Sequence, residues 1–226
     1  MAAGRKLSPI FAGNYFHFVT MPKHYDPELY FTFTYGDTLQ SIRGKHNDNP
    51  TATPLKELQK GDILVLYAGF ERAKNRTKRL IGIFAYICVD CLFIIDHKKK
   101  LAVKFWDGAK GFTHYSDNKQ NRKTYSDLTE GRKTWKPNAG WNPHADPNHA
   151  DWSKKVTQIL ICGDTEVSKM LSKVEILAAL KNGRYEMSGF KARRWGLESK
   201  DYTRNMPRHV DKSKVDAVWR RLKHLP

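Results

Sequence analysis

Side chains capable of acid–base chemistry gather in three short stretches of this chain. FTYGD places Tyr35 and Asp37 at the end of an aromatic run, and GKHNDNP soon afterwards holds His46 and Asp48. A third stretch, NPHADPNHAD, contributes His144. A carboxylate and an imidazole in one cleft can exchange protons with a substrate or hydrogen-bond the edge of an extruded base. The sequence therefore predicts one cleft in which four candidate catalytic residues and a base-contacting tyrosine converge: Asp37, His46, Asp48, His144 and Tyr35.

Each of these stretches also has an ordinary structural explanation. Gly36 and Asp37 can simply form a turn, and the loop around Asp48 can be an Asx-turn before Pro50. The segment NPHADPNHAD offers imidazoles and carboxylates to a divalent metal, but its two prolines and the lack of an obvious scaffold argue against fixed ligands. We therefore predict no metal and no cofactor, and the turn alternatives stay open.

Cations form two further clusters that are candidates for contact with phosphates. One occupies the predicted turn between the apolar runs GDILVLYAGF and RLIGIFAYI and comprises Arg72, Lys74, Arg76, Lys78 and Arg79. The other, in FKARRWGLESKDYTRNMPRH, mixes cations with an aromatic ring and comprises Arg193, Arg194, Arg204, Arg208 and Trp195. Guanidinium groups bind phosphates while rings stack on bases, which suits single-stranded or flipped-base nucleic acid. Trp195 can equally belong to the core.

The composition favours a polyanionic partner. The 226 residues include 40 Lys and Arg against 23 Asp and Glu, a formal net charge of +17 at pH 7. Such a basic balance is typical of nucleic-acid-binding domains. A membrane surface would favour an amphipathic helix with a basic face, and no such helix is found near either terminus. No stretch has the length of a membrane span or the apolar core of a signal peptide, so we expect a cytoplasmic protein without a membrane partner.

The elements that must position these residues form three stretches of one predicted domain, residues 1–226. Residues 8–95 contain short aromatic and β-branched runs that predict a β core, with a short helix in TPLKELQKG. Residues 98–151 are polar without a clear apolar period and predict a long insertion. Residues 154–226 predict a strand in KKVTQILICGD and two helices. The predicted class is α+β, a mixed barrel-like β core with peripheral helices and a long polar insertion.

Helical spacing of apolar residues supports the two helices predicted near the C-terminus. The first stripe, in TEVSKMLSKVEILAALKNG, comprises Val167, Met170, Leu171, Val174, Leu177 and Ala178. Asp164 and Glu166 are predicted to cap this helix rather than to face a phosphate. The second stripe, in SKVDAVWRRLKHL, comprises Val215, Val218, Trp219 and Leu222.

Three cysteines are too few to predict a disulfide framework. Cys88 and Cys91 form a C-x-x-C inside the apolar run YICVDCLFII, and no second cysteine pair is present to complete a zinc site. We therefore interpret them as small buried hydrophobic residues.

Four pieces of the chain, in this order, resemble the nucleotide-modification-associated domain family of the third type: SPIFAGNYFHFVTMP with FTYGD, LKELQKGDILVLYAGF, RLIGIFAYICVD, and NPHADPNHADWSKKVTQILICGDTEVSKMLSKV. His46 and Asp48, in the loop GKHNDNP, and His144, in the last of the four pieces, match positions of the family's motifs. The start of KGDILVLYAGF is also similar to PUA-like and EVE-like barrels that cradle modified bases. The resemblance implies a component of systems that install or handle modified bases in DNA, acting on or recognising a nucleotide.

These observations predict a nucleic-acid-binding protein associated with DNA base modification that recognises a modified or extruded base, with DNA favoured over RNA. One alternative is an enzyme that modifies or removes a nucleobase with Asp and His acid–base residues. A second is a basic structural nucleic-acid-binding protein. The sequence contains no P-loop, no Rossmann glycine fingerprint and no nucleophile elbow, and it leaves open whether any reaction is catalysed.

Overall fold

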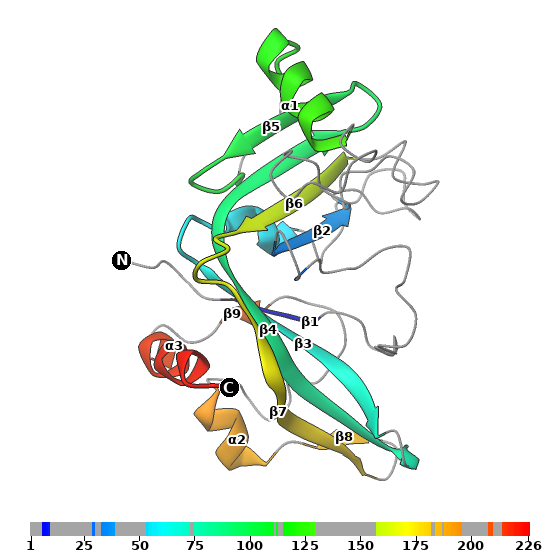
Figure 1. Cartoon of the computed structure of the whole chain (residues 1–226), viewed down its shortest axis with the longest axis vertical. Coiled ribbons are helices and arrows are strands. Elements are labelled where there is room, and N and C mark those ends of the chain that lie inside the picture. Colours follow the sequence, from blue (N-terminus) through cyan, green and yellow to red (C-terminus); the bar gives the residue numbers. More distant parts are fainter. Residues whose placement is uncertain are drawn as a thin grey trace. The chain divides into compact units, whose positions relative to one another are not determined.

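The computed structural model describes residues 6–9, 29, 33–38, 53–72, 75–110, 112, 115–129, 157–181, 184–186, 188–195, 208–209 and 214–226. Strands predominate over helices in these residues, in agreement with the predicted α+β class (Figure 1). The chain divides into two compact units: unit 1 comprises residues 1–21, 62–86 and 169–226, and unit 2 comprises residues 22–61 and 87–168. Each unit contains strands of its own and is described by itself.

The sheet of unit 1 is mixed. Its described strands follow the spatial order β8 (Arg184–Glu186), β7 (Lys169–Lys181), β4 (Asn75–Asp96, up to Tyr86 in this unit), β3 (Ile63–Arg72), β1 (Lys6–Pro9) and β9 (Arg208–His209). The β1–β3 pair is parallel, whereas β4–β7, β7–β8 and β1–β9 are antiparallel. The apolar run from Ile63 to Leu66 is fully buried, as a strand covered on both faces requires.

The helix predicted over residues 167–178 is wrong, because this segment forms strand β7. β7 pairs antiparallel with β4 along residues 169–179 and with β8 only at residues 179–181, so the segment predicted as a helix is paired with β4. Val167 and Met170, the first residues of the expected helical stripe, are exposed, whereas Leu177 and Ala178 are buried although they are adjacent in sequence. Pairing with β4 stabilises an extended backbone more than helix propensity, which is a weak preference, favours a helix.

The two helices of unit 1 pack against its sheet. In α3 (Val215–Lys223) the residues Val215, Val218 and Leu222 are buried, which confirms the predicted helix and its apolar side. Trp219 completes that side, since its ring lies edge-on to Tyr86 of β4 at 5.5 Å between centroids. α2 (Gly189–Arg194) is held to β7 by Lys191, whose ammonium donates to the carbonyl of Ile176.

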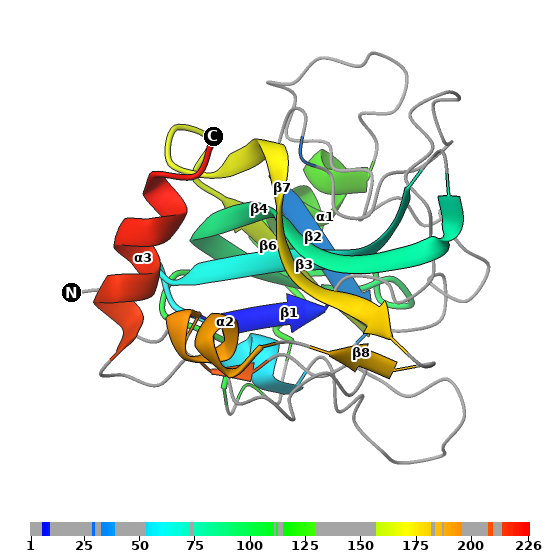
Figure 2. The same cartoon turned by 90° about the horizontal axis from the view of Figure 1, so that it is seen from below.

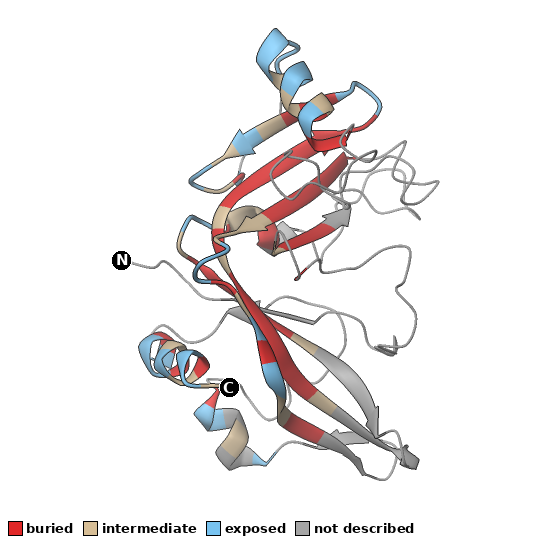
Figure 3. Cartoon of the chain, in the orientation of Figure 1, coloured by how far each residue is buried: buried red, intermediate tan, exposed pale blue. Residues whose placement is uncertain are grey.

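Unit 2 contains an antiparallel sheet with a helix on one side. The described strands follow the order β2 (Thr34–Thr38), β6 (Thr157–Gly163), β4 from Ile87 to Asp96, and β5 (Leu101–Phe105). α1 (Lys119–Thr129) packs on β5, and the 3-10 helix η1 (Thr53–Glu57) occupies the predicted TPLKELQKG segment. The core under α1 consists of Cys91, Phe93, Ile95, Ala102, Tyr125, Leu128 and Leu160. Figure 3 shows this buried stretch along β4 and β6.

The polar insertion predicted at residues 98–151 is in part regular structure. β5 and α1 both lie within it, and residues 130–156 lie outside the described residues. Tyr125, Leu128 and Thr129 are the buried residues of α1, spaced three and four apart as one helix face requires. Only a few buried positions among many polar ones made this helix hard to recognise from sequence.

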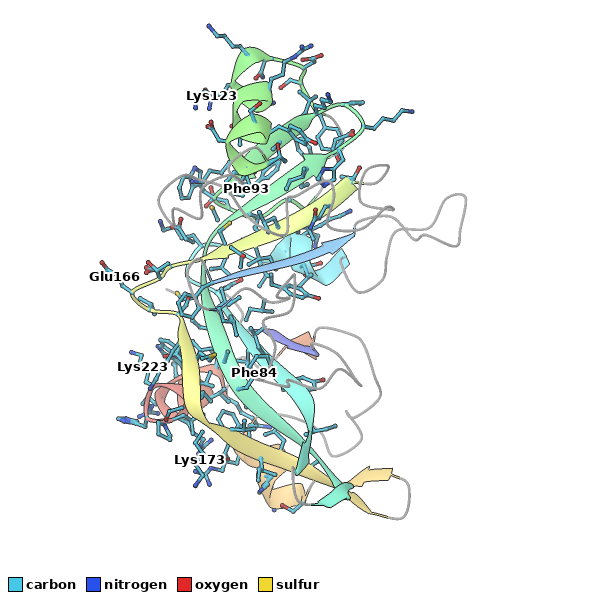
Figure 4. The ribbon with its side chains drawn as sticks, turned by 45° about the vertical axis from the view of Figure 1, so that its right-hand side comes forward. Phe84, Phe93, Lys123, Glu166, Lys173 and Lys223 are labelled. Atoms are coloured by element: carbon cyan, nitrogen blue, oxygen red, sulfur yellow. The ribbon has the colours of Figure 1, made fainter. Side chains whose placement is uncertain are left out.

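The turn between β6 and β7 replaces the predicted helix start. The Asp164 carboxylate accepts hydrogen bonds from the backbone N–H groups of Glu166 and Val167, at 2.9 and 3.3 Å, and its carbonyl accepts from Ser168 N–H at 2.8 Å. Glu166 stands at the outer end of this turn (Figure 4). Asp164 therefore caps free N–H groups as predicted, but in a turn rather than at a helix.

Pairings among the described strands close neither sheet into a barrel, so the barrel-like form of the core stays a prediction. Within the part of the chain that the structure describes, no helix is both long and apolar enough to cross a membrane.

Candidate nucleic-acid interface

The predicted acid–base cleft falls largely outside the described residues. His46, Asp48 and His144 are not described, so the convergence of these residues with Asp37 stays a prediction. Asp37 lies within β2, and its Cα is opposite that of Ile159 in β6. Gly36 pairs with β6 in the same way. The alternative in which Gly36 and Asp37 form a turn is therefore wrong, because both are interior residues of a paired strand.

Tyr35 is buried and its Cα is opposite that of Ile161. Its relative exposure is 6%, so its ring does not lie on the surface of unit 2. The prediction that Tyr35 contacts a base therefore has no surface counterpart in the described part of the chain.

The first predicted cation cluster lies on strands rather than in a turn. Arg72 is the last residue of β3, and Arg76, Lys78 and Arg79 belong to β4, which begins at Asn75. The two strands therefore extend further toward each other along the chain than expected. Lys74 lies outside the described residues.

The second predicted cluster divides between surface and core. Arg193 and Arg194 are exposed at the end of α2, as predicted. Trp195 is fully buried, with a relative exposure of 0%, so its ring cannot stack on a base and the core alternative is the correct one. Arg208 belongs to β9, opposite Leu7 of β1, and Arg204 lies outside the described residues.

α3 is connected to the end of α2 through Arg221. The guanidinium carbon of Arg221 lies 5.6 Å from the centre of the Trp195 ring, and the guanidinium donates to the carbonyl of Arg194. Figure 2 shows α2 and α3 side by side. The C-terminal residues are also attached to β7, because Ser172 N–H donates to Pro226 and the Lys169 ammonium donates to Leu225. These contacts fix α2 and α3 to each other and the C-terminal residues to β7.

Most of the described exposed side chains of these helices are cationic. We define the α2–α3 basic surface as Arg193, Arg194, Lys214, Arg220, Arg221 and Lys223, of which only Arg221 is half-buried and the others are exposed. Asp216 is the one carboxylate in the described residues of α2 and α3. Partial burial and the charge of Arg194 lower the pKa of Arg221, which shows that like charges crowd here. Arginine nevertheless stays protonated at neutral pH.

The helix dipole offers a structural explanation for part of this charge. Lys and Arg in the last turn of a helix interact favourably with its C-terminal carbonyls. Arg193, Arg194, Arg220, Arg221 and Lys223 occupy such positions. The dipole favours cations only in the last turn of a helix, where one or two charges are enough to interact with the free carbonyls. The last turn of each of these two short helices contains at least two adjacent arginines. The excess remains available to an anionic partner. Figure 4 shows Lys223 on α3 and Lys173 on β7 directed away from the sheet.

Unit 2 contains a different cationic site around an exposed indole. Trp106 has a relative exposure of 46%, with the Lys104 ammonium 4.0 Å and the Lys60 ammonium 5.0 Å from its ring centre. Lys60 also pairs with Asp90 at 2.7 Å, and this hydrogen bond raises the pKa of Lys60. We call Lys60, Asp90, Lys104 and Trp106 the Trp106 cluster. A ring flanked by ammonium groups can offer a stacking surface and phosphate contacts together.

Sequence analysis missed both the α3 part of the basic surface and the Trp106 cluster. The α3 cations were visible as RRLK in a predicted helix, on the side opposite its apolar stripe. Trp106 was visible as an aromatic two residues after Lys104 in VKFWDG, but its contact with Lys60 depends on β5 and the residues after η1 meeting in space. In the described residues no three His, Cys, Asp or Glu side chains are grouped as a metal site would require.

Comparison of this chain with protein-family models, with curated proteins and with solved structures finds no match. A function must therefore be inferred from the chain's own residues.

Proposed function

We propose that this chain binds nucleic acid, with DNA favoured over RNA, and that the α2–α3 basic surface contacts its phosphates. The observation that supports this proposal is the placement of five cations on two helices that pack on the sheet of unit 1, with a sixth, Lys214, at the N-cap of α3. Each cation that neutralises a phosphate releases counterions, which gives binding an affinity independent of base sequence. Phosphate contacts of this kind position a nucleic acid and do not read it.

An anionic membrane is the competing polyanion. The expectation that no amphipathic helix with a basic face lies near either terminus is wrong, because α3 is such a helix. Its packing nevertheless disfavours a membrane. An interfacial helix binds a membrane by inserting its apolar face below the headgroups. In α3 that face is occupied, because Val215, Val218 and Leu222 are buried in unit 1. A phosphate backbone needs only the polar side of the helix, which is the side that is exposed.

The second part of the proposal is that the bound nucleic acid carries a modified or extruded base. It is supported by the ordered resemblance of the sequence to a family associated with base modification and by the exposed indole of the Trp106 cluster. With Tyr35 and Trp195 both buried, Trp106 is the most exposed large aromatic residue among those described. The predicted acid–base residues Asp37, His46, Asp48 and His144 belong to the enzymatic alternative.

The test of phosphate binding compares two variants that remove equal charge. Arg193, Arg194 and Arg220 are replaced by Ala in the first, and the exposed Lys98, Lys119 and Lys123 of unit 2 in the second. Fluorescence anisotropy with labelled single-stranded DNA, duplex DNA and RNA is measured over a salt series. We expect micromolar or tighter binding at low salt by the unaltered chain, on the order of 10⁻⁶ M. The slope of log K against log salt should fall by about 2 to 3 in the first variant and much less in the second.

Equal losses in both variants would show that net charge, not the α2–α3 surface, determines binding. Absent binding at low salt would refute the proposal altogether. The same assay with matched modified and plain oligonucleotides, followed by product mass, addresses the second part. Discrimination without a mass change supports base recognition, and a mass change supports the enzymatic alternative.

A further inference from the structure

Two of the three cysteines lie opposite each other in the sheet of unit 2. Cys91 of β4 and Cys162 of β6 are Cα partners in the antiparallel register. Opposite residues of antiparallel strands have Cα atoms about 4.5 to 5.5 Å apart, whichever type of pair they form. A disulfide spans Cα separations of about 4.4 to 6.8 Å, so the separation typical of opposite residues falls within the range that a disulfide can bridge. Neither is in a disulfide now.

A β-bulge creates this pairing. Val89 is opposite Gly163, and the register then shifts so that Cys91, not Asp90, is opposite Cys162. The extra residue of the bulge is Asp90, whose carboxylate is held by Lys60 at 2.7 Å. Without the bulge, Asp90 instead of Cys91 would be opposite Cys162 in the register. Bulges commonly redirect a side chain in this way.

The two thiols have different electrostatic surroundings. A hydrogen bond from the Cys162 thiol to Cys91 lowers the pKa of Cys91, and the charge of Lys104 acts in the same direction against burial and the charge of Asp90. The same hydrogen bond, together with burial, raises the pKa of Cys162 well above its ordinary value. Cys91 is therefore the thiol that ionises first, and thiolates are the nucleophilic form of cysteine.

The position of Lys104 is fixed independently of the cysteines. Its ammonium lies 4.0 Å from the Trp106 ring centre and 5.6 Å from that of Phe93, and Phe93 is the Cα partner of Lys104 across β4 and β5. Cys91 and Phe93 belong to the same core cluster, and Cys162 packs against it. The charge thus stands at the rim of the core, next to the thiol pair, where solvent screening is incomplete.

We propose that Cys91 and Cys162 form a modification site that reacts with peroxide and closes reversibly into a disulfide. The Cys91 thiolate attacks one oxygen of hydrogen peroxide, the O–O bond breaks, and Cys91 sulfenic acid forms with release of hydroxide. Cys162 sulfur then attacks the Cys91 sulfur, the S–O bond breaks, and the Cys162 proton converts the leaving hydroxide to water. Overall, two thiols lose two electrons and one peroxide becomes two waters. A dithiol reductant reverses the reaction by exchange.

The third cysteine provides an internal control. Cys88 N–H donates to the Ser168 hydroxyl at 3.0 Å, and its carbonyl accepts from Asp164 N–H at 2.8 Å, so its backbone is attached to the β6–β7 turn. It is not the register partner of Cys162. Selective oxidation should therefore leave Cys88 as a thiol.

The experiment maps the products in the full, reduced chain after treatment with one equivalent of hydrogen peroxide. Remaining thiols are alkylated, and the protein is cleaved on the N-terminal side of aspartate, which separates Cys88 from Cys91 at Asp90. We expect a peptide pair linked through Cys91 and Cys162, an alkylated Cys88, and loss of the link after reduction. The Cys88→Ala variant should form the same link, and the Cys162→Ala variant should stop at Cys91 sulfenic acid.

A rate comparison tests the assigned roles separately from folding. Lys104→Met should slow oxidation of Cys91 by roughly two- to five-fold because less thiolate is present. Lys98→Met, which removes an equally exposed cation elsewhere in unit 2, should leave the rate unchanged. A link between Cys88 and Cys91, equal alkylation of all three cysteines, or oxidation of Cys91 to the sulfinic acid with Cys162 still reduced would each overturn the proposal.

Discussion

At the scale of single residues, contacts between a cation and an indole occur in two settings with different consequences. Arg221 lies over Trp195, which is fully buried, whereas Lys104 lies over Trp106, which is exposed. In the first case the ring is part of the core, and the cation packs over its face. In the second case the ring remains accessible to a ligand. Burial therefore decides whether the same chemistry stabilises the fold or is available for binding.

Replacement of each indole by alanine should separate these roles. We expect Trp195→Ala to lower the free energy of unfolding by about 3 to 5 kcal/mol, as loss of a buried tryptophan usually does. Trp106→Ala should change it by less than about 1 kcal/mol and should instead weaken binding of single-stranded DNA. Urea denaturation and anisotropy of the same samples provide both measurements. A stability loss that is equal for the two variants would contradict this assignment.

Trp195→Phe is the matched control for the buried ring. Trp195 Nε1 has no hydrogen-bond acceptor among the described residues, so phenylalanine would remove volume without breaking a described hydrogen bond. It should therefore cost clearly less than alanine in the same urea experiment.

At the scale of elements, the decisive feature of unit 1 is the close approach of β4 and β7. The register between them shifts beside Gly82. A Cβ at Gly82 would lie 2.3 Å from Val174 Cγ1 and 2.9 Å from the carbonyl oxygen of Glu175. Contacts this short require a neighbour to move, and the carbonyl belongs to a paired backbone. Glycine is thus needed here for space and not for an unusual backbone angle.

Gly82→Ala should therefore destabilise unit 1 strongly, by about 1 to 3 kcal/mol, in the range typical of overpacking. The double variant Gly82→Ala with Val174→Ala should recover part of the loss, because it removes the side-chain contact and leaves the backbone contact. Thermal and urea denaturation of the single variants and the double variant measure the coupling. If the two substitutions are simply additive, β7 does not cross Gly82 at Val174.

At the scale of the whole molecule, the dominant property is the net charge of +17. Ion pairs do little to counter the repulsion among the excess cations. The described pairs, such as Lys60 with Asp90 and Arg122 with Asp117, are largely exposed and contribute little to stability. Self-repulsion among the excess cations opposes folding, and the same excess attracts polyanions. Salt should therefore affect stability and binding in opposite directions.

A salt series tests that relation. Raising the ionic strength from about 0.01 M to about 0.1 M shortens the Debye length from about 30 Å to about 10 Å. We expect the melting temperature to rise by roughly 2 to 4 °C, equivalent to about 1 kcal/mol, while nucleic-acid affinity falls. The Arg193, Arg194 and Arg220 triple alanine variant should show a smaller rise. A melting temperature that is flat or falls with salt in the unaltered chain would be inconsistent with charge repulsion.

The features predicted correctly from sequence depend on local patterns or on composition. Net charge is a sum over residues, and the helix α3 follows from apolar spacing in one short segment. β6 follows from an apolar run bounded by polar residues. The Asp164 carboxylate accepts hydrogen bonds from the backbone N–H groups that follow it, which a turn leaves free as a helix start does. Arg193 and Arg194 are exposed as predicted, since adjacent cations are costly to bury.

The remaining features depend on which segments meet in space, and only the tertiary structure decided them. β7 is a strand because it pairs with β4, although its own spacing suits a helix. Trp195 is fully buried, with Arg221 of α3 over its ring, and Cys91 is opposite Cys162 because a bulge places it there instead of Asp90. Each outcome depends on hydrogen bonds or packing between residues far apart in sequence. Local periodicity contains no information about such partners, so the sequence by itself determined the charge and the local elements, and the pairing of strands determined the rest.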